Sequence, residues 1–170
     1  MQAMLNKYYY LVSSLPYLKL GQENFINKEA FLLECKKWLS VKDIKVLSKV
    51  SLEDFSVMSG DTPVLQEWKE FDFALRTELA SARNSIKRDR NEKPGPLAKS
   101  VLEEVTPFLM EQALARIRWE RLDSMEAGNF FDLNFLMLYF LKLQIIERLK
   151  LFDKGRGEKV FQDICEVKYE

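Results

Sequence analysis

Apolar residues are densest between Asp132 and Phe152. Every residue from Phe135 to Leu141 is apolar, and the segment contains neither Gly nor Pro, so nothing in it opposes a helix. Asp132 is a favourable N-cap at its start. A membrane span would need about 20 nearly uncharged residues, whereas charged residues interrupt this segment from Lys142 onward. Because a helix that is apolar on every side is typical of a bundle centre, the pattern predicts a central helix at about 133–152.

A second long helix is predicted to begin at Thr62-Pro63, where a threonine cap precedes a proline at the first helical position. The helical pattern continues to about Arg90. Its apolar face consists of Val64, Trp68, Phe71, Leu75, Leu79, Ala82 and Ile86. Beside that face runs a cationic stripe, which consists of Arg76, Arg83, Lys87 and Arg90.

Shorter helical patterns fill most of the remaining chain. They begin at the caps Asn27 and Ser40, at Ser51 (a capping box completed by Asp54), at Leu97, at Thr106-Pro107 and at Glu158. Residues 91–96 form a loop or hinge, and the sequence KGRG is expected to be a flexible connector before the last helix. Tyr8, Tyr9 and Tyr10 suit either a short strand or one helical turn. The sequence therefore predicts one all-α domain over residues 1–170, a bundle of about six or seven helices.

Helical spacing also predicts which side chains point inward. In the helix after Asn27 these are Phe31, Leu32, Cys35, Trp38 and Leu39, and in the last helix they are Val160, Phe161, Ile164 and Cys165. Both cysteines are expected to be buried thiols, because they form no CxxC pair. Partial burial is also expected for the three tyrosines, although an exposed triplet would be a docking surface.

The composition argues against most enzyme classes. Histidine is absent, which removes the commonest general base and nearly all familiar zinc and di-iron patterns. Neither GxGxxG nor a GK[ST] element occurs. The adjacent acids Glu53-Asp54 and Glu103-Glu104 are expected to be solvated surface. We therefore predict no catalytic, cofactor-binding or metal-binding residues, and no small-molecule substrate. The N-terminal segment resembles no signal peptide, so a cytoplasmic protein is expected.

The cationic stripe has a functional and a structural interpretation. It could bind an acidic partner helix or a phosphate backbone, or its arginines could simply cover the core with their heads in water. Asp72 and Arg76 have the spacing of an ordinary i, i+4 ion pair. The stripe contains no interleaved aromatic residues, and the 26 basic residues are balanced by 26 acidic ones; both facts argue against nucleic acid. Further along the chain, Arg116, Arg118 and Arg121 alternate with Glu120 and Asp123, so that their charges largely offset one another. Alternatively, the segments WERLDSME and NFFDLNFL could bury an Arg–Asp contact at the turn between two helices.

Three segments carry a resemblance to a known family. They are YYYLVSSLP, FALRTELASAR and FFDLNFLMLYFLKLQIIERLKLFDKGRGEKVF. Together they resemble a small bacterial family whose members are encoded among the genes of V-type rotary ATPases. That family is distantly similar to the central-stalk socket of these enzymes, an all-helical and non-catalytic component that is termed C in bacteria and d in eukaryotes. This chain is about half the usual length of that socket component.

The resemblance implies a non-catalytic subunit or accessory of a bacterial V-type ATPase. Such a protein would contact stalk or membrane-ring subunits on the cytoplasmic side of the membrane and would need no cofactor. The contact candidates that it implies are Tyr8, Tyr9, Tyr10 and the face of Arg76 and Arg83, which Lys87 and Arg90 extend. Two alternatives stay open: a nucleic-acid-binding module that uses the cationic stripe, and an enzyme of unrecognised type that uses carboxylates or Cys35.

Overall fold

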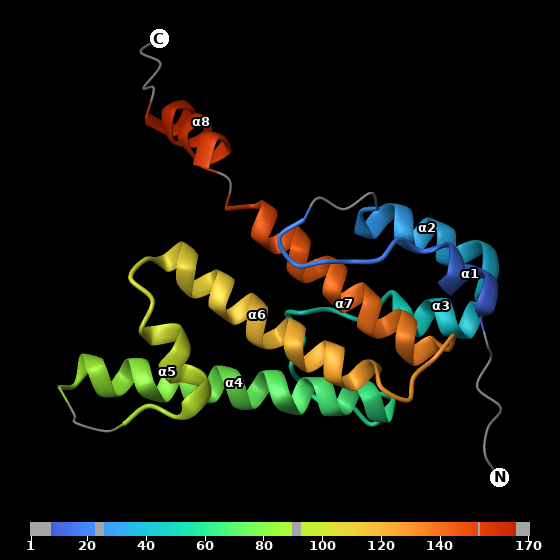
Figure 1. Cartoon of the computed structure of the whole chain (residues 1–170), viewed down its shortest axis with the longest axis horizontal. Coiled ribbons are helices and arrows are strands. Elements are labelled where there is room, and N and C mark those ends of the chain that lie inside the picture. Colours follow the sequence, from blue (N-terminus) through green and yellow to red (C-terminus); the bar gives the residue numbers. More distant parts are fainter. Residues whose placement is uncertain (1–7, 23–25, 90–92, 153, 166–170) are drawn as a thin grey trace.

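The chain folds into helices that are joined by loops and turns (Figure 1). The computed structural model describes residues 8–22, 26–89, 93–152 and 154–165. Within these ranges the helices are α1 (Tyr9–Ser14), α2 (Lys28–Trp38), α3 (Val41–Leu47), α4 (Pro63–Lys87), α5 (Pro96–Leu102), α6 (Pro107–Glu126), α7 (Leu133–Lys150) and α8 (Lys154–Cys165). No strand occurs in these ranges. The predicted all-α fold is confirmed, with eight helices instead of six or seven.

Side-chain caps fix the points at which five helices begin. Each cap accepts a hydrogen bond from a backbone N–H in the first turn of its helix; the caps are Asn27, Ser40, Thr62, Thr106 and Asp132. A cap of this kind pairs one of the donors that a helix start leaves without an intrahelical partner. All five predicted starts are confirmed at the predicted residues.

The core is organised around α7, which contacts α2, α3, α4 and α6. Leu136, Leu138 and Leu143 on α7 have no exposed surface. Phe31 of α2 stacks on Tyr139 and Phe140, with ring centroids 5.2 and 5.5 Å apart. Because burying one large apolar side chain contributes about 1.5–3 kcal/mol, this helix holds much of the stabilising surface. The predicted central helix is confirmed.

A second apolar cluster joins the C-terminal half of α4 to α5 and α6. Its buried members are Leu75, Leu79, Ala82, Ala98, Val101 and Leu114. The apolar face predicted for α4 is correct as far as Ala82, but Ile86 is 67% exposed and Ser85 is buried instead. The reason is visible in Figure 1, where the C-terminal end of α4 extends beyond α5. Ile86, in the last turn of α4, is therefore exposed, although Ser85 in the same turn is buried.

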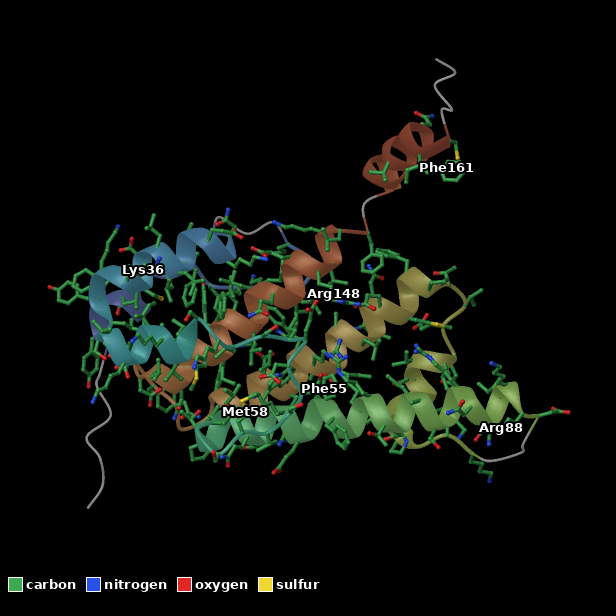
Figure 2. The ribbon with its side chains drawn as sticks, turned by 180° about the vertical axis from the view of Figure 1, so that it is seen from behind. Lys36, Phe55, Met58, Arg88, Arg148 and Phe161 are labelled. Atoms are coloured by element: carbon green, nitrogen blue, oxygen red, sulfur yellow. The ribbon has the colours of Figure 1, made fainter. Side chains whose placement is uncertain are left out.

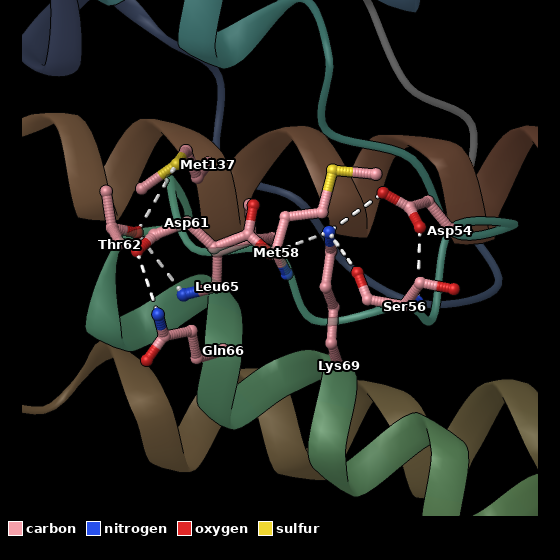
Figure 3. A network of polar contacts seen from close by, with 9 residues as sticks. All are labelled: Asp54, Ser56, Met58, Asp61, Thr62, Leu65, Gln66, Lys69 and Met137. Atoms are coloured by element: carbon pink, nitrogen blue, oxygen red, sulfur yellow. Dashed lines mark hydrogen bonds and ion pairs between the residues drawn. The ribbon is translucent and has the colours of Figure 1, made fainter.

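The segment from Ser51 to Asp61 is a loop. Where a helical turn or two was predicted after Ser51, the loop instead makes a single turn, closed by a hydrogen bond from the Asp54 N–H to the Ser51 carbonyl oxygen (3.4 Å), and forms no helix. Figure 3 shows its anchor, the ammonium group of Lys69 on α4. That group donates to the carboxylates of Asp54 (2.8 Å) and Asp61 (2.9 Å) and to the carbonyl oxygen of Ser56 (2.9 Å). Lys69 is 3% exposed. A buried ammonium group needs such partners, so the Asp54 carboxylate serves this ion pair and does not cap a helix.

The last helix differs most from its prediction. α8 begins at Lys154, so the KGRG sequence lies inside the helix and is not a connector. Val160, Phe161 and Ile164 are 52%, 67% and 75% exposed, and Cys165 is exposed as well. Figures 1 and 2 show why: α8 projects away from the other helices, and Phe161 lies far from the core around α7. Among the described residues, the side chains that the spacing predicts to point inward are therefore exposed.

The apolar character of the helices also bears on the membrane. None of the helices within the described ranges has the length and apolar character that a membrane crossing requires.

Candidate partner-binding surfaces

The contact candidates lie on two separate parts of the molecule. The three tyrosines, Tyr8 to Tyr10, are at the start of α1. The cationic residues Arg76, Arg83 and Lys87 lie along the C-terminal half of α4. Figure 1 places α1 and the C-terminal end of α4 at opposite ends of the bundle. Arg90 lies outside the described residues. The structure therefore does not bring the tyrosines and the cationic stripe together.

The first part is an exposed group of aromatic rings, Tyr9, Tyr10 and Trp38, which we call the aromatic surface. Their exposed fractions are 56%, 80% and 50%. The rings of Tyr10 and Trp38 are stacked, with centroids 5.9 Å apart and planes 1° from parallel. They line a shallow hollow of about 590 Å³. Helical spacing predicted that Trp38 points inward; the structure instead places it at the last turn of α2, beside the exposed face of α1.

Tyr8 plays a different part from the other two tyrosines. Its hydroxyl donates to the carboxylate of Asp43, and its backbone N–H donates to the carbonyl oxygen of Phe131 (2.5 Å). Leu11, in the next turn, is 1% exposed. These contacts fix α1 on the bundle. Partial burial, predicted for all three tyrosines, is correct for Tyr8 and wrong for Tyr9 and Tyr10.

The second part is organised by a buried carboxylate, Asp72, which is 2% exposed. It accepts hydrogen bonds from Nε of Arg76 (2.6 Å) and from Nε of Arg118 on α6 (2.8 Å). The i, i+4 pair of Asp72 and Arg76 is therefore as predicted, whereas the contact of Arg118 with Asp72 was not predicted from the sequence. Arg76 also donates to the carbonyl oxygen of Leu52 (2.9 Å). Arg76 thus ties α4 to the loop and is in part a structural residue.

Four arginines line one hollow of about 650 Å³ between α4, α6, the end of α7 and the loop; we call it the arginine cleft. They are Arg76, Arg83, Arg118 and Arg148. Lys87 is exposed but does not line the cleft. Arg118 and Arg148 were not predicted as members, because they lie on other helices and only the tertiary fold brings them beside α4. No signal in the sequence marked them for this role.

Aromatic rings also line the arginine cleft. The sequence pattern indicated no aromatic residues within the cationic stripe, but the fold places two rings beside it. Phe55 of the loop and Phe73 of α4 are stacked with centroids 6.3 Å apart, and both are exposed. The guanidinium carbon of Arg76 lies 5.1 Å from the ring centroid of Phe55. Figure 2 labels Phe55 together with Arg148, whose guanidinium group donates to the carboxylate of Glu111. Phe55 was missed because it belongs to a loop whose position beside α4 could not be predicted from the sequence.

Two further groups, the thiol of Cys35 and the carboxylate of Asp54, have shifted pKa values. Cys35 has no exposed surface, and burial raises the pKa of its thiol to about 12; a protonated, buried thiol is a poor nucleophile. The hydrogen bond from Lys69 holds the pKa of Asp54 below its usual value. Among the residues with described positions, no group of three or more His, Cys, Asp or Glu could hold a metal ion. The expectation of two buried thiols is correct for Cys35 and wrong for Cys165.

Comparison with known proteins links part of the chain to a family. A family model described as "Protein of unknown function (DUF2764)" matches residues 99–168, which is less than half of the chain. The matched stretch includes Arg118 and Arg148 of the arginine cleft, whereas the aromatic surface and Arg83 lie outside it. No curated protein and no solved structure matches the chain.

Proposed function

We propose that this protein is a non-catalytic component or accessory of a bacterial V-type ATPase that binds other subunits through the aromatic surface. The observation that carries the proposal is the stacked pair of Tyr10 and Trp38, both at least half exposed. Single exposed aromatic residues are common, but adjacent exposed rings mark interaction sites.

The chemistry of these side chains suits a protein partner. Tyr and Trp supply large, rigid contact areas and are enriched among the residues that dominate protein interfaces. Little conformational entropy remains to be lost, because Tyr8 and Leu11 already hold α1 on the bundle and the two rings stack on each other. The aromatic surface is therefore partly organised before a partner binds.

The link to the V-type ATPase rests on the resemblance of the sequence segments. The segment YYYLVSSLP is one of them and contains Tyr9 and Tyr10. In the socket-like role that the resemblance implies, the protein supplies a rigid helical body between stalk and ring subunits. Catalysis and proton movement belong to other subunits.

An affinity pull-down tests this proposal. The tagged protein is recovered from detergent-solubilised cells at low and moderate salt, and the chains that co-purify are identified by mass. We expect stalk or ring subunits of the V-type ATPase in a fixed ratio, and at least a tenfold lower recovery with Trp38→Ala, in line with the roughly 2 kcal/mol or more that aromatic hot-spot residues contribute.

The matched control is Leu33→Ala, which shortens another exposed apolar side chain of α2 that does not line the hollow at the aromatic surface. Recovery should be unchanged in this variant. The absence of ATPase subunits from the wild-type pull-down would contradict the proposal, and so would equal losses in the Leu33→Ala and Trp38→Ala variants.

A second candidate function is binding of single-stranded nucleic acid in the arginine cleft. The observation in its favour is that the rings of Phe55 and Phe73 are exposed beside Arg76, because bases stack on such rings while arginines contact phosphates. Its signature is affinity for an oligonucleotide that falls steeply with salt concentration. An affinity that does not change with salt would exclude it.

A further inference from the structure

We propose that the arginine cleft is a second binding site, which takes a short acidic segment of a partner protein. In this site a carboxylate of the segment pairs with Arg83, and a neighbouring apolar side chain packs on Phe55 and Phe73. The inference rests on the proposed function only in that both require a protein partner. It concerns a different surface and does not depend on the identity of the ATPase.

Arg83 is the residue of the cleft that is available to a ligand. It lies on the exposed side of α4 and lines the cleft. Within the ranges that the structure describes, it forms neither an ion pair nor a side-chain hydrogen bond, whereas Arg76, Arg118 and Arg148 each bond a carboxylate of the protein. A guanidinium group can hold a carboxylate through two parallel hydrogen bonds. The free guanidinium group of Arg83 therefore offers a ready contact for an acidic side chain.

Arg118 gives the cleft a second, more rigid cation. It is 8% exposed, and Asp72 holds its Nε atom at 2.8 Å. Arg118 also lines the cleft. Neither of its two terminal nitrogens is an atom that is both fully buried and without a hydrogen-bond partner. Because Asp72 engages only Nε, these nitrogens remain able to donate to an oxygen in the cleft. A buried and pre-oriented donor loses little entropy when a ligand binds.

The charge balance favours a peptide over a nucleic acid. Three carboxylates lie in or beside the cleft, those of Glu53, Glu111 and Asp72, and they leave the four arginines an excess of one positive charge. A phosphate backbone carries a charge at every nucleotide and binds through several uncompensated cations, and it would also meet the carboxylates of Glu53 and Glu111. A segment with one or two acidic side chains matches this balance better.

The walls and size of the cleft account for the apolar part of the ligand. Phe73 is 54% exposed, and Leu79, Ala80 and Leu114 also line the hollow. Its volume of about 650 Å³ lies in the usual range for ligand sites, roughly 300–1,000 Å³. The cleft thus combines an apolar wall with the guanidinium group of Arg83, which selects for an acidic side chain next to an aliphatic or aromatic one.

The test is selection from a random peptide library displayed on phage, with the full-length protein as bait. We expect the selected peptides to be enriched in Asp or Glu next to Leu, Phe or another large apolar residue. The strongest peptide is then labelled, and its affinity is measured by fluorescence anisotropy against wild type and Arg83→Glu. We expect Arg83→Glu to weaken binding about tenfold or more, because an attraction is replaced by a repulsion.

The control variant is Arg116→Glu, which makes the same charge change at an exposed arginine of α6 outside the cleft. Its affinity for the peptide should stay near that of wild type. Selected peptides without acidic residues would overturn the proposal, as would equal effects of Arg83→Glu and Arg116→Glu. Tighter binding of an oligothymidylate that is lost in Arg83→Glu would overturn it in favour of nucleic acid.

These outcomes are independent of the pull-down described above. If the protein binds acidic peptides through Arg83 but recovers no ATPase subunits, the proposal for the arginine cleft is supported and the proposed function is contradicted. If the protein recovers ATPase subunits through Trp38 but selects no acidic peptides, the proposed function is supported and the proposal for the arginine cleft is contradicted.

Discussion

Single residues in this protein show how a helical bundle can bury charge. Lys69 and Asp72 are 3% and 2% exposed, three residues apart on α4. Each is matched by two side chains of opposite sign, Lys69 by Asp54 and Asp61, and Asp72 by Arg76 and Arg118. Removing one partner of a buried pair leaves a charge that is poorly solvated, which costs more than the pair itself contributes. We interpret both networks as devices that fix the loop and α6 on α4.

The Asp54–Lys69 contact predicts a pH dependence of stability. The hydrogen bond from Lys69 lowers the pKa of Asp54 from 3.8. The stabilisation that this contact contributes is therefore fully present at pH values well above 3.8, and it is lost as the pH falls through the lowered pKa of Asp54. Asp54→Asn should have a smaller free energy of unfolding than wild type at pH 7, and the difference should narrow below pH 4. Urea unfolding at several pH values measures this.

The control for this prediction is Glu70→Gln, which removes an acidic charge from an exposed side chain of α4. Its free energy of unfolding should follow that of wild type at every pH. A constant difference in the free energy of unfolding between Asp54→Asn and wild type from pH 7 down to pH 2 would contradict the prediction, because it would mean that the ionised carboxylate of Asp54 is not the source of the stabilisation.

Leu143 tests the core. Its side chain has no exposed surface on the central helix. Leu143→Ala should lower the free energy of unfolding by about 2–5 kcal/mol, through lost burial and the cavity left behind. The exposed Leu33, changed to Ala, should shift it by less than about 0.5 kcal/mol. Chemical denaturation measures both values. If Leu143→Ala and Leu33→Ala lower the free energy of unfolding by the same amount, α7 is not the centre of the bundle.

At the scale of helices, the sequence predicts well the residues at which helices begin, but it predicts poorly which apolar residues are exposed. A start depends on local chemistry, such as Thr62 followed by Pro63, which the chain alone specifies. Whether an apolar residue is buried depends on another helix covering it. Ile86 and Trp38 have the spacing of core residues, yet both lie exposed at the last turn of a helix. Periodicity cannot show where the covering helix stops.

The position of α8 is open to a simple chemical test. Cys165 at its end is exposed, whereas Cys35 is fully buried with a pKa raised to about 12. A maleimide reagent at neutral pH should therefore add one label to the folded protein, at Cys165, and two labels after denaturation. Mass spectrometry of the intact protein counts them. Protection of Cys165 in the folded state would mean that α8 packs on the bundle.

At the scale of the whole molecule, the candidate site is the part that the sequence could predict least. Arg76 and Arg83 were selected from the spacing on α4, but the cleft also needs Phe55, Arg118 and Arg148. These residues come from a loop and two other helices. Their meeting follows from how α6 and α7 cross α4, and from the Lys69 anchor of the loop, rather than from any local pattern. The aromatic surface likewise needs α1 and α2 side by side.

The most direct test of the proposed function is the occupancy of this chain in the V-type ATPase itself. The enzyme is purified through its catalytic component from cells that express wild type, Trp38→Ala or Leu33→Ala, and the amount of this chain is measured by quantitative mass spectrometry. We predict a fixed ratio to the catalytic component with wild type and Leu33→Ala, and at least a tenfold loss with Trp38→Ala. Absence of the wild-type chain from the purified enzyme would contradict the proposed function.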